Sequence, residues 1–248
     1  MKNKINIKVV NSINKFKAKD WDNCNKNGNV FLSYNFLKLL EDSNSIGGNT
    51  GWQPIYFCLK VDDKITAVVP SFIKYHSQGE FVFDHSWAQA YQSLGLNYYP
   101  KLLIASPFSP VTGKRILVTQ NINALIKKKL FDFIKDFCKE KKISSIHINF
   151  FEEHELDFLK NEGFLIRYGE QFHFTNNNYN TFEDFLNKLS YKIRKSINKE
   201  RQSIKHQGID IEIIKNEKFN KNLSEIMYQF YISTCLLYTS PSPRDSSQ

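Results

Sequence analysis

Glu80 and Asp84 are two carboxylates four residues apart, and their type and spacing suit acid–base catalysis. The segment 80–84 is predicted to be a strand, and a strand places side chains an even number of residues apart on one face. A carboxylate beside a cleft can remove the proton from an amine, the step that amide formation needs at neutral pH. The same spacing also occurs where a strand end faces water, so both interpretations remain open.

His147 is a second candidate base, because it shares a predicted strand face with Asn149. A single histidine is also common as a structural residue. The four cysteines show no CxxC spacing and no histidine cluster accompanies them, so the sequence predicts no metal site. No Gly-x-Ser-x-Gly motif or Cys-His-Asp set is present either, which favours direct transfer over a covalent enzyme intermediate.

Anion binding is suggested by four consecutive residues, Thr112, Gly113, Lys114 and Arg115. Glycine lets the backbone approach a ligand closely, and the two cations would offset the charge of phosphate groups. The loop is therefore a candidate cofactor-binding cradle. The same residue types also form ordinary solvated turns, so the pattern alone does not decide between the two.

Aromatic residues with polar tips are candidates for lining a ligand groove, because they combine an apolar ring with a hydrogen-bonding group. Trp52, Tyr98 and Tyr99 are the candidates for substrate binding, since Pro100 fixes the chain just after the two tyrosines. Packing in a core accounts for aromatic residues at these positions as well.

One local cluster of positive charge runs from Lys188 to Lys205. Within it, Arg194, Lys195 and Arg201 are candidates for contact with a tRNA or a phosphorylated precursor, because cations along a helix can follow phosphates. The alternative is the solvated side of an amphipathic helix. The net charge of 34 − 25 = +9 does not choose between them, because a composition rich in Lys, Asn and Ile is typical of an AT-rich genome.

The elements that would position these residues follow from hydrophobic periodicity. Strands are predicted at residues 5–10, 53–60, 65–75, 80–84, 101–106, 143–151, 164–168 and 171–174. Helices are predicted at residues 16–24, 33–40, 87–94, 122–142 and 152–162. The strands at 101–106 and 143–151 are expected to be neighbours. This order predicts an α/β fold of the α+β type over residues 1–175, with a mixed, mostly antiparallel sheet flanked by helices.

Residues 176–234 are expected to begin a second, incomplete domain, with a basic helix, a strand at 209–214 and a helix at 217–234. From residue 235 the composition changes, because the last 14 residues contain no Lys, Asn or Ile. This segment, 235–248, resembles a translated sequencing adapter and is expected to be an extended, non-native tail. No signal peptide or membrane-spanning stretch is predicted, so a cytoplasmic protein is expected.

The predicted order of strand, loop, long helix, strand, helix and final strands is similar to the acetyltransferase (GNAT) fold. More specifically, the chain resembles the bacterial FemAB-like N-acyltransferases, described as peptidoglycan biosynthesis or recognition proteins. The resemblance runs from about residue 30 to residue 234. It rests on GWQP at 51–54, HSQGEFVFD at 76–84, WAQAY at 87–91, YYPKL at 98–102, PFSPVTG at 107–113, QFHF at 171–174, FEDFL at 182–186, and the pairs RK at 194–195 and ER at 200–201.

The resemblance implies transfer of an acyl or aminoacyl group to an amine, with acyl-CoA or aminoacyl-tRNA as donor and a small molecule or cell-wall precursor as acceptor. It also implies two tandem GNAT-like domains, so a chain holding only part of the second is expected to be an inactive fragment. The loop at 107–115 lacks the Gly-x-Gly pattern of CoA-binding acetyltransferases, and Leu159 stands where many of them carry a tyrosine. Two other functions therefore remain open: a non-catalytic module that recognises a cell-wall precursor, and a tRNA- or RNA-binding protein.

Overall fold

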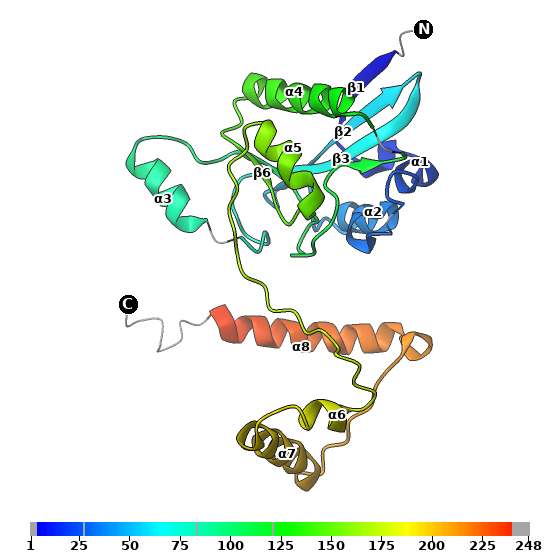
Figure 1. Cartoon of the computed structure of the whole chain (residues 1–248), viewed down its shortest axis with the longest axis vertical. Helices are drawn as coiled ribbons and strands as arrows, with labels where there is room; N and C mark the ends of the chain where they lie inside the picture. The colour runs from blue at the N-terminus through cyan, green and yellow to red at the C-terminus, as the bar shows by residue number, and fades with distance from the viewer. Residues whose placement is uncertain (1–3, 27, 83, 121, 240–248) are drawn as a thin grey trace. The chain divides into compact units, whose positions relative to one another are not determined.

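A computed structural model describes residues 4–26, 28–82, 84–120 and 122–239. The chain divides into two compact units, Met1–Gly169 and Glu170–Gln248, coloured in chain order in Figure 1. Every strand of the described residues lies in the first unit, and the second unit consists of helices and loops. A second GNAT-like domain therefore stays a prediction.

One sheet forms the centre of the first unit. Its neighbours are antiparallel except β4 and β6, which run parallel with Leu103 opposite His147. The predicted mixed, mostly antiparallel sheet is confirmed, and so is the predicted pairing of the strands at 101–106 and 143–151. In spatial order the strands are β1 (Ile5–Val10), β2 (Trp52–Val61), β3 (Lys64–Lys74), β4 (Lys101–Ile104) and β6 (Ile146–Ile148), and the short β5 (Leu117–Val118) also pairs with β3.

The strands predicted at 53–60 and 65–75 form the hairpin of β2 and β3. It closes through Asp62 and Asp63, whose φ angles of 48° and 65° are both positive. Positive φ at both positions matches the right-handed twist of the two strands. A residue with a Cβ atom is strained in that conformation, which is why glycine is favoured at the second position.

Replacing Asp63 with glycine is therefore expected to raise the free energy of unfolding by about 0.5–1 kcal/mol, because relief of left-handed strain exceeds the entropic cost of glycine. Asp62 stays unchanged, since its carboxylate accepts a hydrogen bond from Lys4 N at 2.9 Å. Urea unfolding measures the difference. Lys64→Gly, one residue later in extended β3, is the matched control and should destabilise; a destabilising Asp63→Gly would contradict the strain argument.

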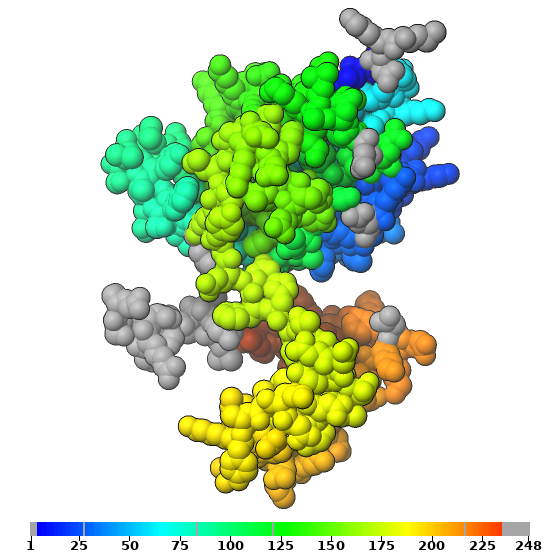
Figure 2. Space-filling view, in the orientation of Figure 1, coloured from blue at the N-terminus to red at the C-terminus, as the bar shows by residue number. Residues whose placement is uncertain are grey.

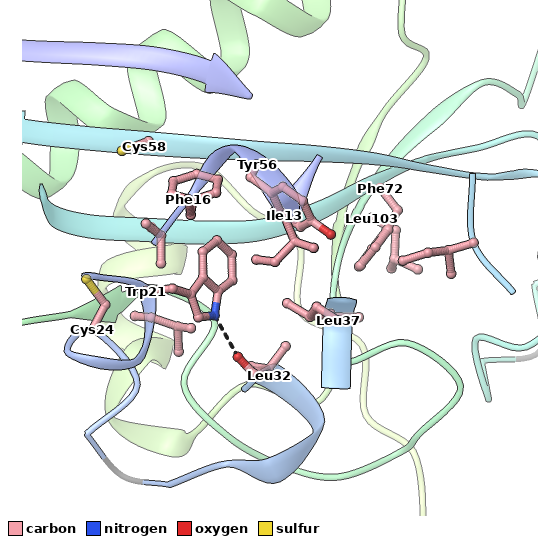
Figure 3. Packing of buried hydrophobic residues seen from close by; sticks show 14 of the residues in the cluster. Ile13, Phe16, Trp21, Cys24, Leu32, Leu37, Tyr56, Cys58, Phe72 and Leu103 are labelled. Atoms are coloured by element: carbon pink, nitrogen blue, oxygen red, sulfur yellow. Dashed lines mark hydrogen bonds between the residues drawn. The ribbon is translucent and has the colours of Figure 1, made fainter. Parts of the chain in front are cut away.

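Two apolar cores lie on the two faces of the sheet, and alternate residues of β2 enter alternate cores, Tyr56 the first and Phe57 the second. The first core includes residues of α1 (Ala18–Asp22) and α2 (Tyr34–Asp42). At its centre Trp21 packs edge-to-face against Phe16 and donates its indole N–H to Leu32 O at 2.9 Å (Figure 3). The second core includes residues of α4 (Ala124–Glu140) and α5 (Leu156–Asn161), which cover the opposite face (Figure 1).

The helix α3 (His85–Ser93) lies apart from both cores. None of its residues is buried, and it stands out from the side of the first unit in Figure 2. Asp84 is its N-cap residue and makes no side-chain cap hydrogen bond. The Asp84 carboxylate is instead directed into the site described below.

Several predicted elements are absent among the described residues. The segments 164–168, 171–174 and 209–214 form no strand, and the predicted helix at 152–162 splits into a 3₁₀ turn, Glu153–Glu155, followed by α5. The second unit contains α6 (Phe182–Leu186), α7 (Tyr191–His206) and α8 (Lys221–Thr239). The predicted extended tail is wrong for residues 235–239, which continue α8, and residues 240–248 lie outside the described residues.

Among the described residues, none of the helices is both long enough and apolar enough to cross a membrane.

Candidate active site

Two buried lysines meet where β3 ends and β4 begins. Lys74 and Lys101 are partners in the antiparallel register, so their side chains leave the same face of the sheet, and both are 0% exposed. Two ammonium groups held side by side away from water repel each other strongly. They need anionic partners at close range.

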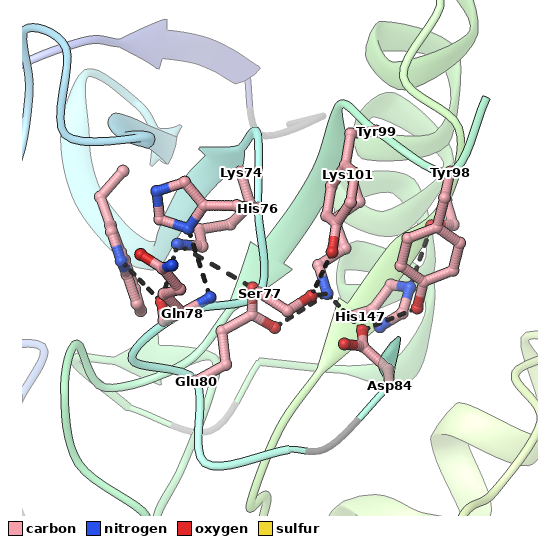
Figure 4. Close-up of polar contacts among 12 residues, drawn as sticks. Lys74, His76, Ser77, Gln78, Glu80, Asp84, Tyr98, Tyr99, Lys101 and His147 are labelled. Atoms are coloured by element: carbon pink, nitrogen blue, oxygen red, sulfur yellow. Dashed lines mark hydrogen bonds and ion pairs between the residues drawn. The ribbon is translucent and has the colours of Figure 1, made fainter. Parts of the chain in front are cut away.

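Glu80 and Asp84 supply those partners (Figure 4). Lys101 Nζ lies 2.9 Å from Glu80 Oε2 and 2.6 Å from Asp84 Oδ2, and it donates to Ser77 Oγ at 2.8 Å. Two of the three ammonium donors are given to Asp84 and Ser77 in hydrogen-bonding geometry, and Glu80 is held as an ion pair. We call Lys74, Ser77, Glu80, Asp84 and Lys101 the buried ionic cluster.

Lys74 is held on the other side of Glu80. Its Nζ lies 4.0 Å from Glu80 Oε1, donates to Gln78 O at 3.2 Å and stands 3.7 Å above the ring of Trp52. Burial, followed by repulsion from Lys101, lowers the pKa of Lys74 against the attraction of Glu80. Trp52 is only 2% exposed, and its ring faces Lys74 inside the protein, so contact of Trp52 with a substrate stays a prediction.

A loop, not the predicted strand, delivers the two carboxylates. Residues 80–82 and 84 carry no strand assignment, and positive φ angles at Gly79 (78°) and Phe81 (56°) turn the chain on both sides of Glu80. Glycine is required at 79 because a Cβ atom there would lie 2.8 Å from the ring of Phe108. The loop thus directs Glu80 and Asp84 into the protein, and both are buried.

The environments of these carboxylates drive their pKa values in opposite directions. Burial raises the pKa of Glu80, and the neighbouring lysines only partly offset this. Burial also acts to raise the pKa of Asp84, but hydrogen bonds involving Lys101, Ser77 and Tyr98 outweigh it and hold the pKa at about 2. Such a split is the usual mark of an acid–base group beside a fixed charge. Glu80 is the group that can exchange a proton, and Asp84 stays ionised.

Glu80 also lacks hydrogen-bond donors. Lys101 approaches it as an ion pair, yet both carboxylate oxygens are buried with no partner in hydrogen-bonding geometry, as is Asp84 Oδ1. A buried acceptor without a donor costs about 1–3 kcal/mol. Such an arrangement is retained more readily where a ligand or a transferred proton completes it.

His147 and Tyr98 border the cluster from β6 and from the segment before β4 (Figure 4). Tyr98 donates to Asp84 Oδ2 at 2.7 Å, and its ring packs edge-to-face against the half-buried His147 at 5.9 Å. Burial, followed by the positive charge of Lys101, lowers the pKa of His147 to about 4. Its imidazole is therefore neutral at pH 7. The structure brings together Glu80, Asp84 and His147, all selected from the sequence.

The lowered pKa of His147 predicts a loss of stability in acid. Its pKa is about 4 in the folded protein against 6.5 ordinarily, so the unfolded chain binds more protons between those values and stability falls as the pH drops through this window. Replacing His147 with glutamine should remove about 1–3 kcal/mol of that pH dependence. Urea unfolding at pH 7 and at pH 4.5 measures it. His154→Gln, at an exposed position, is the control. If stability changes equally between the two pH values in both variants, the pH dependence does not come from His147.

Three of the four residues of the predicted anion cradle line a cleft, and Arg115 does not. Thr112, Gly113 and Lys114 line a cleft of about 430 Å³ that also includes Lys26. Neither Glu80 nor Asp84 lines it, and the first residues of α4 do not either. Among the described residues, the cleft beside Thr112–Lys114 is therefore separate from the two predicted carboxylate bases.

Arg115 does not face this cleft. It is 2% exposed, and its guanidinium donates to Asn149 O at 2.7 Å, to Phe150 O at 2.9 Å and to Val111 O. Burial lowers the pKa of Arg115 to about 10, so it stays charged at pH 7. The predicted phosphate contact of Arg115 is wrong, because its donors are used by main-chain carbonyls.

The loop also fits the pyrophosphate of CoA poorly. Gly113 N donates to Phe150 O at 3.0 Å and Arg115 N to Glu155 Oε2 at 3.2 Å, so two of its backbone donors are already used. The Arg115 guanidinium also bridges the residues that follow β4 and β6, because it reaches both Ser106 Oγ and Asn149 O. The loop therefore offers no complete cradle for the pyrophosphate of CoA.

The remaining substrate-binding candidates are Tyr99 in the first unit and three cations in the second. Tyr99 is half-buried, and its hydroxyl lies 2.7 Å from Ser77 Oγ. On α7, Arg201 stands 4.5 Å above the ring of Phe182, while Arg194 donates to Asn187 Oδ1 at 3.4 Å and Lys195 is exposed. Their contact with a substrate stays a prediction.

Sequence reasoning missed Lys74, Lys101 and Ser77. A signal was present at Lys101, because it begins a segment whose next four residues, 102–105, are all apolar. A lysine in a strand of that character is rarely placed there without a charged partner. No group of three His, Cys, Asp or Glu side chains suited to a metal ion occurs among the described residues.

No curated protein matches this chain. Among solved structures, an aminoglycoside N-acetyltransferase in complex with CoA is similar over 72% of this chain and 98% of its own, with 12% identity and a TM-score of 0.42. The model of the FemAB-like family, described as peptidoglycan biosynthesis/recognition, matches residues 12–243. This chain belongs to the FemAB-like family of peptidoglycan biosynthesis and recognition proteins.

Proposed function

We propose that the chain transfers an acyl or aminoacyl group to an amine of a cell-wall precursor, with Glu80 as the general base. The observation that carries this proposal is the state of Glu80, a buried carboxylate with a raised pKa and no hydrogen-bond donor. An amine N–H is the donor that such a carboxylate needs. Membership of a peptidoglycan-related family supports a precursor amine as the acceptor.

The reaction starts from an ammonium group. Glu80 accepts one of its protons, and the free amine attacks the carbonyl carbon of the donor. The new C–N bond forms, the bond from the carbonyl carbon to the donor oxygen or sulfur breaks, and the departing atom takes the second amine proton. Asp84 stays ionised and keeps Lys101 in place. One proton per turnover is left on Glu80.

An aminoacyl ester suits the chain better than a CoA thioester as donor. The loop at 112–115 offers no complete pyrophosphate cradle, because the Arg115 side chain and the Gly113 amide are already bonded. In the second unit, α7 carries six Lys and Arg residues against a single acidic residue, Glu200. That charge is suited to the phosphates of a tRNA.

The alternative is a module that recognises the precursor without reacting with it. The Glu80 side chain has no exposed surface. Recognition needs no access to that carboxylate, whereas transfer requires the turn at 78–81 to move aside when the substrate binds.

The experiment incubates the full chain with a peptide-bearing peptidoglycan precursor and either mixed aminoacyl-tRNA or acetyl-CoA. Mass spectrometry then looks for a precursor heavier by one aminoacyl or acetyl group. Binding of the precursor without any mass increase would reject transfer in favour of recognition.

A further inference from the structure

A general base that is buried away from water must lose the proton it has accepted before it can act again. The Glu80 side chain is 0% exposed, and the proposed reaction leaves one proton on it in each turnover. Direct release to solvent is therefore blocked in the closed arrangement. This argument rests on the proposed function, and it asks which described groups lead from Glu80 to the surface.

Two hydrogen-bonded branches leave Lys101, the neighbour of Glu80 (Figure 4). One runs through Asp84 to the hydroxyl of Tyr98 and ends there, because Tyr98 is only 6% exposed. The other runs from Lys101 Nζ to Ser77 Oγ at 2.8 Å and from Ser77 Oγ to the hydroxyl of Tyr99 at 2.7 Å. Tyr99 is half-buried, so this branch alone reaches a partly exposed group.

We propose that Lys101, Ser77 and Tyr99 form a proton relay that carries the proton of Glu80 to solvent. Lys101 gives one ammonium proton to Ser77 Oγ, Ser77 passes its own hydroxyl proton to Tyr99, and Tyr99 releases its hydroxyl proton to water. The neutral Lys101 amine then takes the proton from Glu80, whose Oε2 lies 2.9 Å away. All groups return to their starting states, and one proton has left the protein.

The direction of the hydrogen bonds supports this route. Lys101 can only donate, so Ser77 Oγ accepts from it, and the single hydroxyl hydrogen of Ser77 can be given to Asp84 or, when the hydroxyl rotates, to Tyr99. The hydrogen of Tyr99 is then free for water or substrate. The two hydrogen bonds of the route are 2.8 and 2.7 Å long, and the ion pair across which Glu80 returns its proton to Lys101 spans 2.9 Å, so each heavy-atom distance is short enough for proton transfer.

The test uses the full chain with ¹⁵N-labelled lysine and follows the exchange of the Lys101 ammonium protons with water by NMR. This readout does not depend on turnover. Tyr99→Phe and Ser77→Ala are expected to slow the exchange about tenfold or more, because each removes a hydroxyl from the route. Ser77→Thr restores a hydroxyl and should recover the wild-type rate. Tyr75→Phe, at an exposed position outside the cluster, should leave the rate unchanged.

Turnover gives the second readout. If the wild type transfers, Tyr99→Phe should lower kcat about tenfold or more with KM nearly unchanged, and the loss should be largest at low buffer concentration. If the wild type does not transfer, the proposed function fails, and the exchange measurement still decides whether the relay exists. Ammonium exchange in Tyr99→Phe and Ser77→Ala as fast as in the wild type would overturn the relay.

Discussion

Replacing Lys101 with methionine is expected to destabilise the first unit by about 3–5 kcal/mol, since one partner of a buried ionic network is lost. Lys101 Nζ lies within 2.9 Å of Glu80, Asp84 and Ser77, and its side chain is 0% exposed. Methionine fills a similar volume without charge. The variant would leave two carboxylates buried beside Lys74 alone, which lies 4.0 Å from Glu80.

Tryptophan fluorescence during urea unfolding is the suitable measurement, because all three tryptophans, Trp21, Trp52 and Trp87, lie in the first unit. Lys38→Met is the matched control. Lys38 pairs with Asp42 on the surface, where solvent screens the two charges, so its loss should change the free energy of unfolding little. The deficit of the Lys101 variant should shrink as the pH falls, because protonation removes the charge of the stranded carboxylates. Equal losses in the two variants would show that the cluster is not held by charge.

The parts of the fold that could be predicted from the sequence are those with a local periodic signal. The helix α4 carries an apolar stripe at helical spacing with Leu130 and Ile134 buried. The helix predicted from residue 33 is α2, whose N-cap Ser33 accepts a hydrogen bond from Phe36 N. The β2–β3 hairpin follows from two apolar runs separated by a short polar turn. In each case neighbours in sequence are also neighbours in space.

The predicted strands that are absent from the described residues depend on partners distant in the sequence. The segment 164–168 begins with three apolar residues and 171–174 alternates, both patterns that strands show, yet Leu165 is 94% exposed and Phe172 is 101% exposed. A strand needs a partner with which to exchange hydrogen bonds, and the described residues offer none to these segments. An alternating pattern predicts which face of a strand would be apolar, but it does not indicate that a neighbouring strand exists.

The candidate site likewise contains residues that could be predicted from the sequence and residues that could not. Glu80, Asp84 and His147 could be selected by residue type, because few other groups can act as bases near neutral pH. Lys74 and Lys101 could not, because they meet only through the register of β3 with β4 across 27 residues of chain (101 − 74 = 27). Arg115 was misplaced for a related reason, since composition cannot tell a cation that faces solvent from one that bonds main-chain carbonyls.

Replacing Glu80 with glutamine is expected to lower the rate of transfer by about 10²–10⁴-fold, the usual contribution of a positioned general base. Glutamine keeps the shape of the side chain and cannot accept the amine proton. The wild-type rate should rise with pH as Glu80 loses its proton, and because burial raises the pKa of Glu80, this rise should lie above the pH at which an ordinary glutamate ionises. The variant should lack the rise altogether.

Two comparison variants separate the loss of a base from the loss of structure. Glu153→Gln removes an exposed carboxylate of the same unit and should leave the rate unchanged. Asp84→Asn removes the carboxylate whose pKa is held at about 2 by Lys101, Ser77 and Tyr98, so it should lower the free energy of unfolding, while the pH at which the rate rises stays set by Glu80. If Glu80→Gln keeps the wild-type rate and pH profile while remaining folded, the amine proton leaves by another group, and the half-buried His147 becomes the base to test next.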